Sequence, residues 1–188
     1  MDIKKQVEGC VANDSLTQEF VFNKHSSKLM GICSRYFDRL EDAEDSLTEA
    51  FILIFGKIKQ YKGGNDESIF FSWMKKISIN VCLTKIRKEK KNKLLVSLEN
   101  NEFYLSEKIV VENDDPHGAK ELLKIIHELP EGFRTVFNLF AIEGYSHKEI
   151  GQMLNISEGT SKSQYSRAKN YLRVKLEKIG ITNSLVEA

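Results

Sequence analysis

The hydrophobic pattern of this chain is helical almost throughout. Apolar residues recur every three or four positions in three early segments, about 16–40, 41–60 and 68–91, and again from residue 129 to about 180. Few stretches alternate between apolar and polar residues as strands do. The sequence therefore predicts an all-α fold made of two small helical domains.

The segment 41–60 has two contrasting sides. Its predicted core stripe consists of Ala43, Leu47, Phe51, Ile54 and Ile58. The opposite side carries four residues that we call the docking face: Asp42, Asp45, Glu49 and Ile52. Acids around an exposed isoleucine favour a surface that binds a helix of another protein. The alternative is a solvated face with one stray apolar residue.

The segment 68–91 is apolar on most sides, so we expect it to lie inside a helical bundle. Its narrow polar stripe, with the basic run that follows, we call the basic edge: Lys76, Asn80, Thr84, Arg87 and Lys88. Lysine and arginine at helical spacing bind phosphates, and an asparagine amide can both donate to a base and accept from it. The alternative is an ordinary solvated face.

A glycine-containing loop, which we call the aromatic loop, precedes this segment. It comprises Tyr61, Lys62, Gly63, Gly64 and Asn65, with Phe70 and Phe71 just beyond it. The glycines allow close approach of a ligand, and Tyr61 or the phenylalanine pair can stack on an unpaired base. The alternative is that these aromatic side chains are ordinary core.

The C-terminal part has the pattern of a helix-turn-helix. Leu129 and Pro130 begin a helix, and Ser146 with Glu149 forms a capping box for the next one. Asn155 suits a left-handed turn, after which Ser157 caps a longer helix. The residues expected at the DNA are Glu158, Thr160, Lys162, Ser163 and Arg167. The alternative is a solvated basic face.

The net charge of +1 over 188 residues conceals a segregation. Residues 61–93 carry 9 basic and 3 acidic side chains, whereas residues 94–130 carry 3 basic and 8 acidic ones. Residues 97–115 also lose helical periodicity and lead into the turn sequence Asp-Asp-Pro-His-Gly. We therefore expect a first domain over 1–93, an acidic linker over 94–118 and a second domain over 119–188.

Composition argues against several other classes of protein. The longest apolar run, residues 50–55, is far too short to span a bilayer, and the N-terminus does not resemble a secretion signal. Three dispersed cysteines and four scattered histidines provide neither a disulfide framework nor a metal site. We expect a cytoplasmic protein that is not an enzyme and needs no metal or cofactor.

Taken together, the motifs resemble those of a known family. Residues 42–51 read DAEDSLTEAF, residues 70–80 read FFSWMKKISIN, and residues 143–146 and 159–163 read EGYS and GTSKS. In this order and spacing they resemble the sigma-70-type bacterial sigma factors of the extracytoplasmic-function (ECF) group along almost the whole chain. Thr84 departs from the family's usual Asp or Asn. Ser161 and Gly151 replace the usual valine and alanine, which predicts looser packing there.

The resemblance implies a subunit that binds RNA polymerase core and directs it to promoters. The docking face would bind the clamp helices of the largest polymerase subunit, and the second-largest subunit would contribute its flap. The basic edge and aromatic loop would read and melt the minus-10 element, and the helix-turn-helix would read the minus-35 element. An anti-sigma factor is a further expected partner. The alternative is a helix-turn-helix regulator that binds duplex DNA without polymerase.

Overall fold

The computed structural model describes residues 1–96 and 124–178. These residues form helices and turns without any strand, which confirms the predicted all-α class. The chain divides into two compact units, Met1–Glu107 and Lys108–Ala188.

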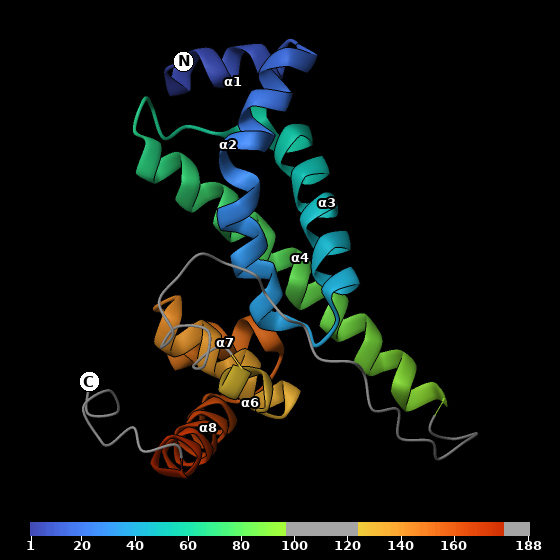
Figure 1. The fold of residues 1–188 in the computed structure, drawn as a ribbon, viewed down its shortest axis with the longest axis vertical. Helices are drawn as coiled ribbons and strands as arrows, with labels where there is room; N and C mark the ends of the chain where they lie inside the picture. Colours follow the sequence, from blue (N-terminus) through green and yellow to red (C-terminus); the bar gives the residue numbers. More distant parts are fainter. Residues whose placement is uncertain (97–123, 179–188) are drawn as a thin grey trace. The chain divides into compact units, whose positions relative to one another are not determined.

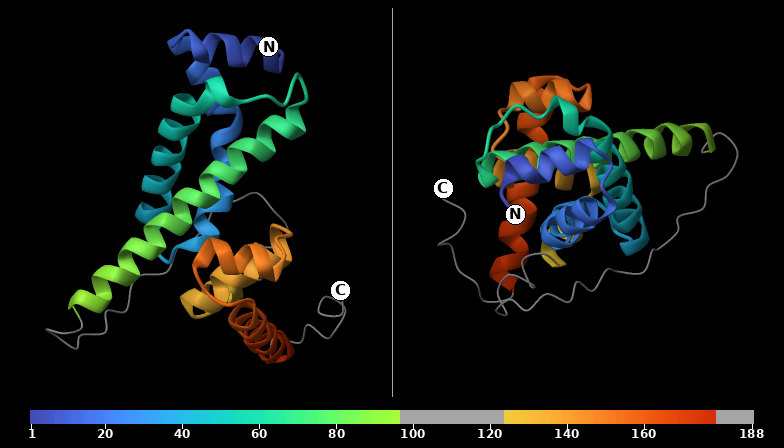
Figure 2. Two further views of the ribbon diagram at one scale, coloured as in Figure 1. Left: turned by 180° about the vertical axis from the view of Figure 1, so that it is seen from behind. Right: turned by 90° about the horizontal axis from the view of Figure 1, so that it is seen from above.

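The first unit is a bundle of four helices. They are α1 (Ile3–Val11), α2 (Ser15–Cys33), α3 (Leu40–Lys57) and α4 (Glu67–Val96), with short 3-10 turns at Ser34–Tyr36 and Ile58–Gln60. Helices α2, α3 and α4 pack against one another, and α1 lies against α2 and the Ile58–Gln60 turn (Figure 1). Seen from behind, α4 crosses the bundle diagonally, and its C-terminal end projects beyond α2 and α3 (Figure 2).

The core of this bundle follows the predicted apolar stripe of α3. Ala43, Phe51, Ile54 and Ile58 are buried, and Leu47 is half-buried. Each large apolar side chain removed from water in this way contributes about 1.5–3 kcal/mol toward folding. The other face of α3 is thereby left on the surface, as the sequence predicted.

Two parts of the first unit differ from the prediction. Helix α1 was not anticipated, because its buried positions Ile3, Gln6 and Cys10 include a polar glutamine that hides the apolar stripe. The helix expected over 16–40 ends instead at Cys33, and Phe37 is extended, so a separate helix begins at Leu40.

Helix α4 is longer than predicted. It continues to Val96, so the first three residues of the expected linker over 94–118 are helical. The rest of that linker, residues 97–118, lies outside the described residues.

The second unit contains the predicted helix-turn-helix. Residues 124–127 form a helical turn, α6 (Glu131–Phe137) continues as a π-helix over Asn138–Ile142, and α7 (His147–Leu154) and α8 (Glu158–Lys178) follow. Both α6 and α7 pack on α8. Six of its buried apolar residues form one cluster: Ile125, Ile126, Leu129, Ala168, Leu172 and Leu176.

The turn between α7 and α8 is built from local hydrogen bonds. Ser146 and Glu149 form the predicted capping box, and Asn155 takes the left-handed conformation with φ of 54°. The Ser157 hydroxyl accepts a hydrogen bond from the Thr160 amide at 2.9 Å, which caps α8. All three predicted turn features are confirmed.

Candidate nucleic-acid and protein interfaces

The basic edge lies along one exposed side of α4. Lys76, Asn80, Arg87 and Lys88 are exposed, and Thr84 is partly buried. Since positions 76, 80, 84 and 87 are separated by three or four residues, they share one face of the helix. The structure therefore brings these predicted residues together on an accessible surface that suits phosphate and base contacts.

Thr84 links two members of the basic edge. Its hydroxyl donates to the Asn80 carbonyl at 2.7 Å and accepts from an Arg87 terminal nitrogen at 3.3 Å. The Arg87 Nε also donates to the Leu83 carbonyl at 3.1 Å. Thr84 therefore orients the arginine, and its own proton is already used within the helix.

The aromatic loop is held between α3 and the first turn of α4. The Tyr61 ring packs edge-on against Phe70, with ring centroids 5.0 Å apart, and lies 5.5 Å from Trp73. Gly63 has no room for a side chain, because an added Cβ would lie 2.5 Å from the Tyr61 hydroxyl oxygen. Gly64 has φ of 69°, a conformation that favours glycine.

Two predicted loop residues have other roles in this structure. Phe70 is fully buried and cannot itself stack on a base; it supports the Tyr61 ring from inside the core. The Asn65 side chain accepts a hydrogen bond from the Lys4 amide at 3.0 Å. Tyr61, which is partly exposed, and Lys62, which is exposed, are loop side chains available to a ligand.

The docking face of α3 is exposed at three of its four positions. The Asp45 side chain is 78% exposed and Ile52 is 66% exposed, and Glu49 is also on the surface. Asp42 is different, because its side chain is only 29% exposed and lies beside Lys85. The structure therefore presents an acidic surface around one protruding isoleucine.

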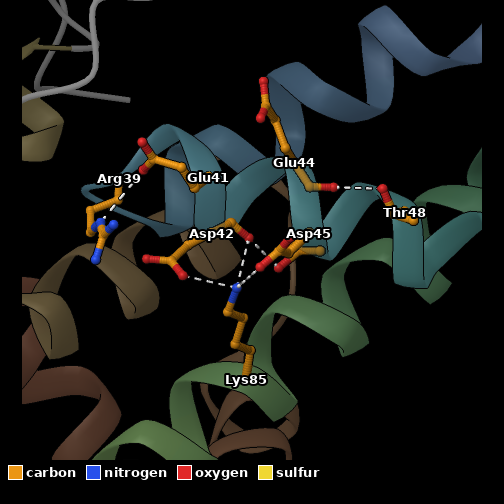
Figure 3. A network of polar contacts seen from close by, with 8 residues as sticks. Arg39, Glu41, Asp42, Glu44, Asp45, Thr48 and Lys85 are labelled. Carbon is orange, nitrogen blue, oxygen red and sulfur yellow. Dashed lines mark hydrogen bonds and ion pairs between the residues drawn. The ribbon is translucent and has the colours of Figure 1, made fainter.

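Lys85 is the first residue of the basic run 85–93 in the sequence, but in the structure it lies between α3 and α4 (Figure 3). Its Nζ lies 2.9 Å from the Asp42 carboxylate and 3.4 Å from that of Asp45. It also donates to the Asp42 carbonyl at 3.2 Å. Burial lowers the pKa of Lys85, but hydrogen bonds and charge from Asp42 and Asp45 outweigh it, so the pKa is raised. The sequence alone gave no signal for this contact between residues 43 apart.

The predicted DNA-facing residues of α8 fall into two groups. Arg167 is exposed on the surface of the helix. Lys162 and Glu158 pair with each other at 2.6 Å, and this hydrogen bond lowers the pKa of Glu158. The hydroxyls of Thr160 and Ser163 bond within the first turns of α8, to Ser157 and to the Thr160 carbonyl. Of the two cations of α8 that are predicted to contact DNA, Lys162 is already paired with Glu158, so Arg167 is the more accessible one.

The contact between α7 and α8 is tighter than predicted. An added Cβ at Gly151 would lie 2.8 Å from the Ile156 carbonyl oxygen, so the expectation of looser packing at this glycine is wrong. Ser161 is fully buried, and its hydroxyl lies 2.9 Å from Nδ1 of His147. The His147 ring stacks on Phe140, with centroids 4.1 Å apart. The buried serine is therefore compensated by a hydrogen-bond partner.

Neither a metal centre nor a membrane segment is found in the described part of the chain. Among those residues, no group of three or more His, Cys, Asp or Glu side chains could hold a metal ion. None of the described helices is both long and apolar enough to cross a bilayer.

Comparison with known proteins identifies both units. Residues 21–92 match the family model for sigma-70 region 2, and residues 119–172 match that for sigma-70, region 4. The ECF sigma factor SigW of Bacillus subtilis is 29% identical over 187 residues, covering 94% of this chain and 97% of the relative. The ECF sigma-E factor of Haemophilus influenzae is 27% identical over 181 residues, covering 91% and 93%.

A solved structure shares the fold. It is the sigma factor RpoE in complex with the anti-sigma factor NepR from Bartonella quintana, with a TM-score of 0.57 and 19% identity. The match covers 85% of this chain and 96% of that one. The chain belongs to the sigma-70 family, and it is an ECF-group sigma factor that recognises promoters together with RNA polymerase.

Proposed function

We propose that the first unit performs two separate tasks on two helices. The docking face on α3 binds the clamp helices of the largest polymerase subunit. The basic edge on α4, with the aromatic loop, reads the minus-10 element and holds one unpaired base. The observation that carries this proposal is that α3 exposes Asp45, Glu49 and Ile52, whereas α4 exposes a different set of side chains: Lys76, Asn80, Arg87 and Lys88.

In the minus-10 proposal, each residue type has a physical role. Lys76, Arg87 and Lys88 neutralise phosphates, and the exposed Asn80 amide contacts a base edge. Tyr61 provides a partly exposed ring on which an unpaired base stacks. Because Thr84 orients Arg87, its replacement would change the placement of a phosphate contact rather than remove a base contact.

The second unit reads the minus-35 element through the N-terminal part of α8. The Asn155 turn joins α7 to α8, and the contact between His147 and Ser161 and the close approach at Gly151 hold the two helices together. This geometry presents Arg167 and the Glu158–Lys162 pair on the surface. Phosphate contacts from such residues position a helix-turn-helix, and base-edge contacts supply its sequence preference.

The remaining roles follow from this function. The protein contributes no catalytic group, since RNA synthesis belongs to the polymerase, and it works in the cytoplasm, where polymerase and promoter are found. The flap of the second-largest polymerase subunit is a further partner. An anti-sigma factor that covers either unit would block both promoter and polymerase.

Two kinds of variant separate the two tasks. Asp45→Lys and Ile52→Lys are expected to abolish binding to polymerase core in a fluorescence titration. Glu19→Lys, at an exposed position of α2, is the control that matches the charge change of Asp45→Lys. Asn80→Ala is expected to leave core binding intact and to reduce the permanganate reactivity of promoter thymines. Full core binding by both docking-face variants would contradict the assignment of α3.

A further inference from the structure

Asn65 connects two segments that are far apart in the sequence. Its side-chain oxygen accepts a hydrogen bond from the Lys4 amide at 3.0 Å, across 61 residues. The first amides of a helix have no partner within the helix. In α1 the Lys5 amide is capped by Asp2 at 2.8 Å, and the Lys4 amide is capped by Asn65. Asn65 thus acts as a second N-terminal cap, supplied from the aromatic loop.

Helix α1 is packed closely against the rest of the first unit, so its position is well defined. Ile3, Gln6 and Cys10 are at most 3% exposed. At Gly9 an added Cβ would lie 2.5 Å from the Thr17 hydroxyl oxygen, so α1 and α2 approach closely. Helix α1 also packs on the Ile58–Gln60 turn, which leads directly into the aromatic loop. Its first turn is therefore a rigid attachment point.

The aromatic loop needs such an attachment. On one side of Asn65, Asp66 is fixed as the cap of α4, since it accepts from the Ser68 amide at 2.7 Å and the Ile69 amide at 3.2 Å. On the other side, the consecutive glycines Gly63 and Gly64 are the most permissive backbone positions of this loop. The hydrogen bond between Asn65 and α1 therefore restrains the loop directly beside its two glycines, where the residue types restrain the backbone least.

We propose that Asn65 is a positioning residue for promoter opening, through which α1 holds the aromatic loop in the conformation that accepts an unpaired base. This inference rests on the proposed role of the loop. A loop ordered before the base arrives does not lose that conformational freedom on binding. Loss of the bond should therefore slow promoter opening and leave the recruitment of polymerase unchanged.

Two substitutions of Asn65 distinguish positioning from direct contact with DNA. Asn65→Ala removes the cap, and we expect about fivefold slower opening, from the usual effect of a lost cap. Asn65→Asp keeps an acceptor and places a negative charge at the start of α1, which is favourable there. The same aspartate loses the amide donor and repels phosphates. A positioning role predicts near-normal opening for Asn65→Asp, whereas a direct DNA contact predicts a defect as large as that of alanine.

The experiment uses full-length protein assembled with polymerase core on promoter DNA. Permanganate reactivity of promoter thymines over time reports opening, core titration reports recruitment, and Asn23→Ala on exposed α2 is the matched control. Slow opening for Asn65→Ala with recovery for Asn65→Asp supports the proposal. Normal opening for Asn65→Ala, or equal defects for both variants, overturns it.

A third variant and a second measurement separate this inference from the role of the loop. If Tyr61→Ala opens promoters normally, the aromatic loop does not hold the base, and the proposed positioning role falls with it. The cap itself is tested without DNA by exchange of the Lys4 amide, followed by NMR. Faster exchange in Asn65→Ala but not in Asn65→Asp supports the cap, and equal exchange in the wild type and Asn65→Ala overturns it.

Discussion

Replacing Lys85 by methionine should destabilise the first unit. The Lys85 ammonium makes contacts of 2.9 Å and 3.2 Å with the Asp42 carboxylate and carbonyl, and one of 3.4 Å with Asp45. Its side chain is 21% exposed and that of Asp42 29%. Hydrogen bonds to charged groups contribute about 1.5–3 kcal/mol, and fully exposed ion pairs at most about 1 kcal/mol. The Lys85–Asp42 pair is partly buried, so its contribution should lie between these two values. We therefore expect Lys85→Met to lower the free energy of unfolding by about 2 kcal/mol.

The assay can follow the first unit by itself. Trp73 is the sole tryptophan of the chain and lies in α4, so its fluorescence during urea unfolding reports this unit and not the helix-turn-helix. A loss of about 2 kcal/mol lowers the urea midpoint by about 1 M for a domain of this size. Methionine retains the apolar stem of lysine, so the change removes only the ammonium group with its ion pairs and its contact with the Phe37 ring, whose centroid is 5.4 Å away.

Lys88→Met provides the matched control, because Lys88 is exposed on the same helix. We expect it to change stability by less than about 0.5 kcal/mol, as for most surface substitutions. Asp42→Asn should cost more than Asp45→Asn, since Asp42 is closer to Lys85 and more buried. Equal midpoints for Lys85→Met and Lys88→Met would refute the structural role assigned to Lys85.

Three further predictions concern other parts of the chain. Asn155→Ala should lower the stability of the second unit by about 1 kcal/mol, seen as a lower melting temperature by circular dichroism, because alanine does not favour φ of 54°. Arg167→Glu should weaken holoenzyme binding to minus-35 DNA and reduce its salt slope by about 1, whereas an unchanged slope would contradict the contact. Burial lowers the pKa of His25 below 6.5, and the positive charge of Lys24 lowers it further. The unfolded state therefore binds more protons than the folded state as pH falls, so the stability reported by Trp73 should drop below pH 6.5. His25→Gln should flatten this pH dependence.

Local features of the sequence predicted the second unit well. The capping box, the Asn155 turn and the Ser157 cap each depend on contacts between residues at most five apart. Such contacts are determined by residue type and spacing, which the sequence shows directly. The apolar stripe of α3 was equally readable, because helical period alone decides which side is buried.

Contacts between distant residues were not readable in the same way. Lys85 resembles its basic neighbours in sequence, yet tertiary packing places it against Asp42, 43 residues away. Asn65 looked like a loop residue free to meet a base, but it caps α1. Phe70 was expected to be able to stack on an unpaired base, whereas it is buried and packs against the Tyr61 ring. In each case the side-chain type was recognised and the partner was not, because spacing along a chain does not reveal long-range contacts.

The most direct test of the proposed function is transcription in vitro with polymerase core on a library of genomic DNA. The structure and the family predict that core transcribes from defined start sites only when this protein is added, with shared minus-10 and minus-35 sequences upstream. Binding of the protein to duplex DNA without core, together with no core-dependent transcription, would contradict the assignment and favour a regulator that acts independently of polymerase.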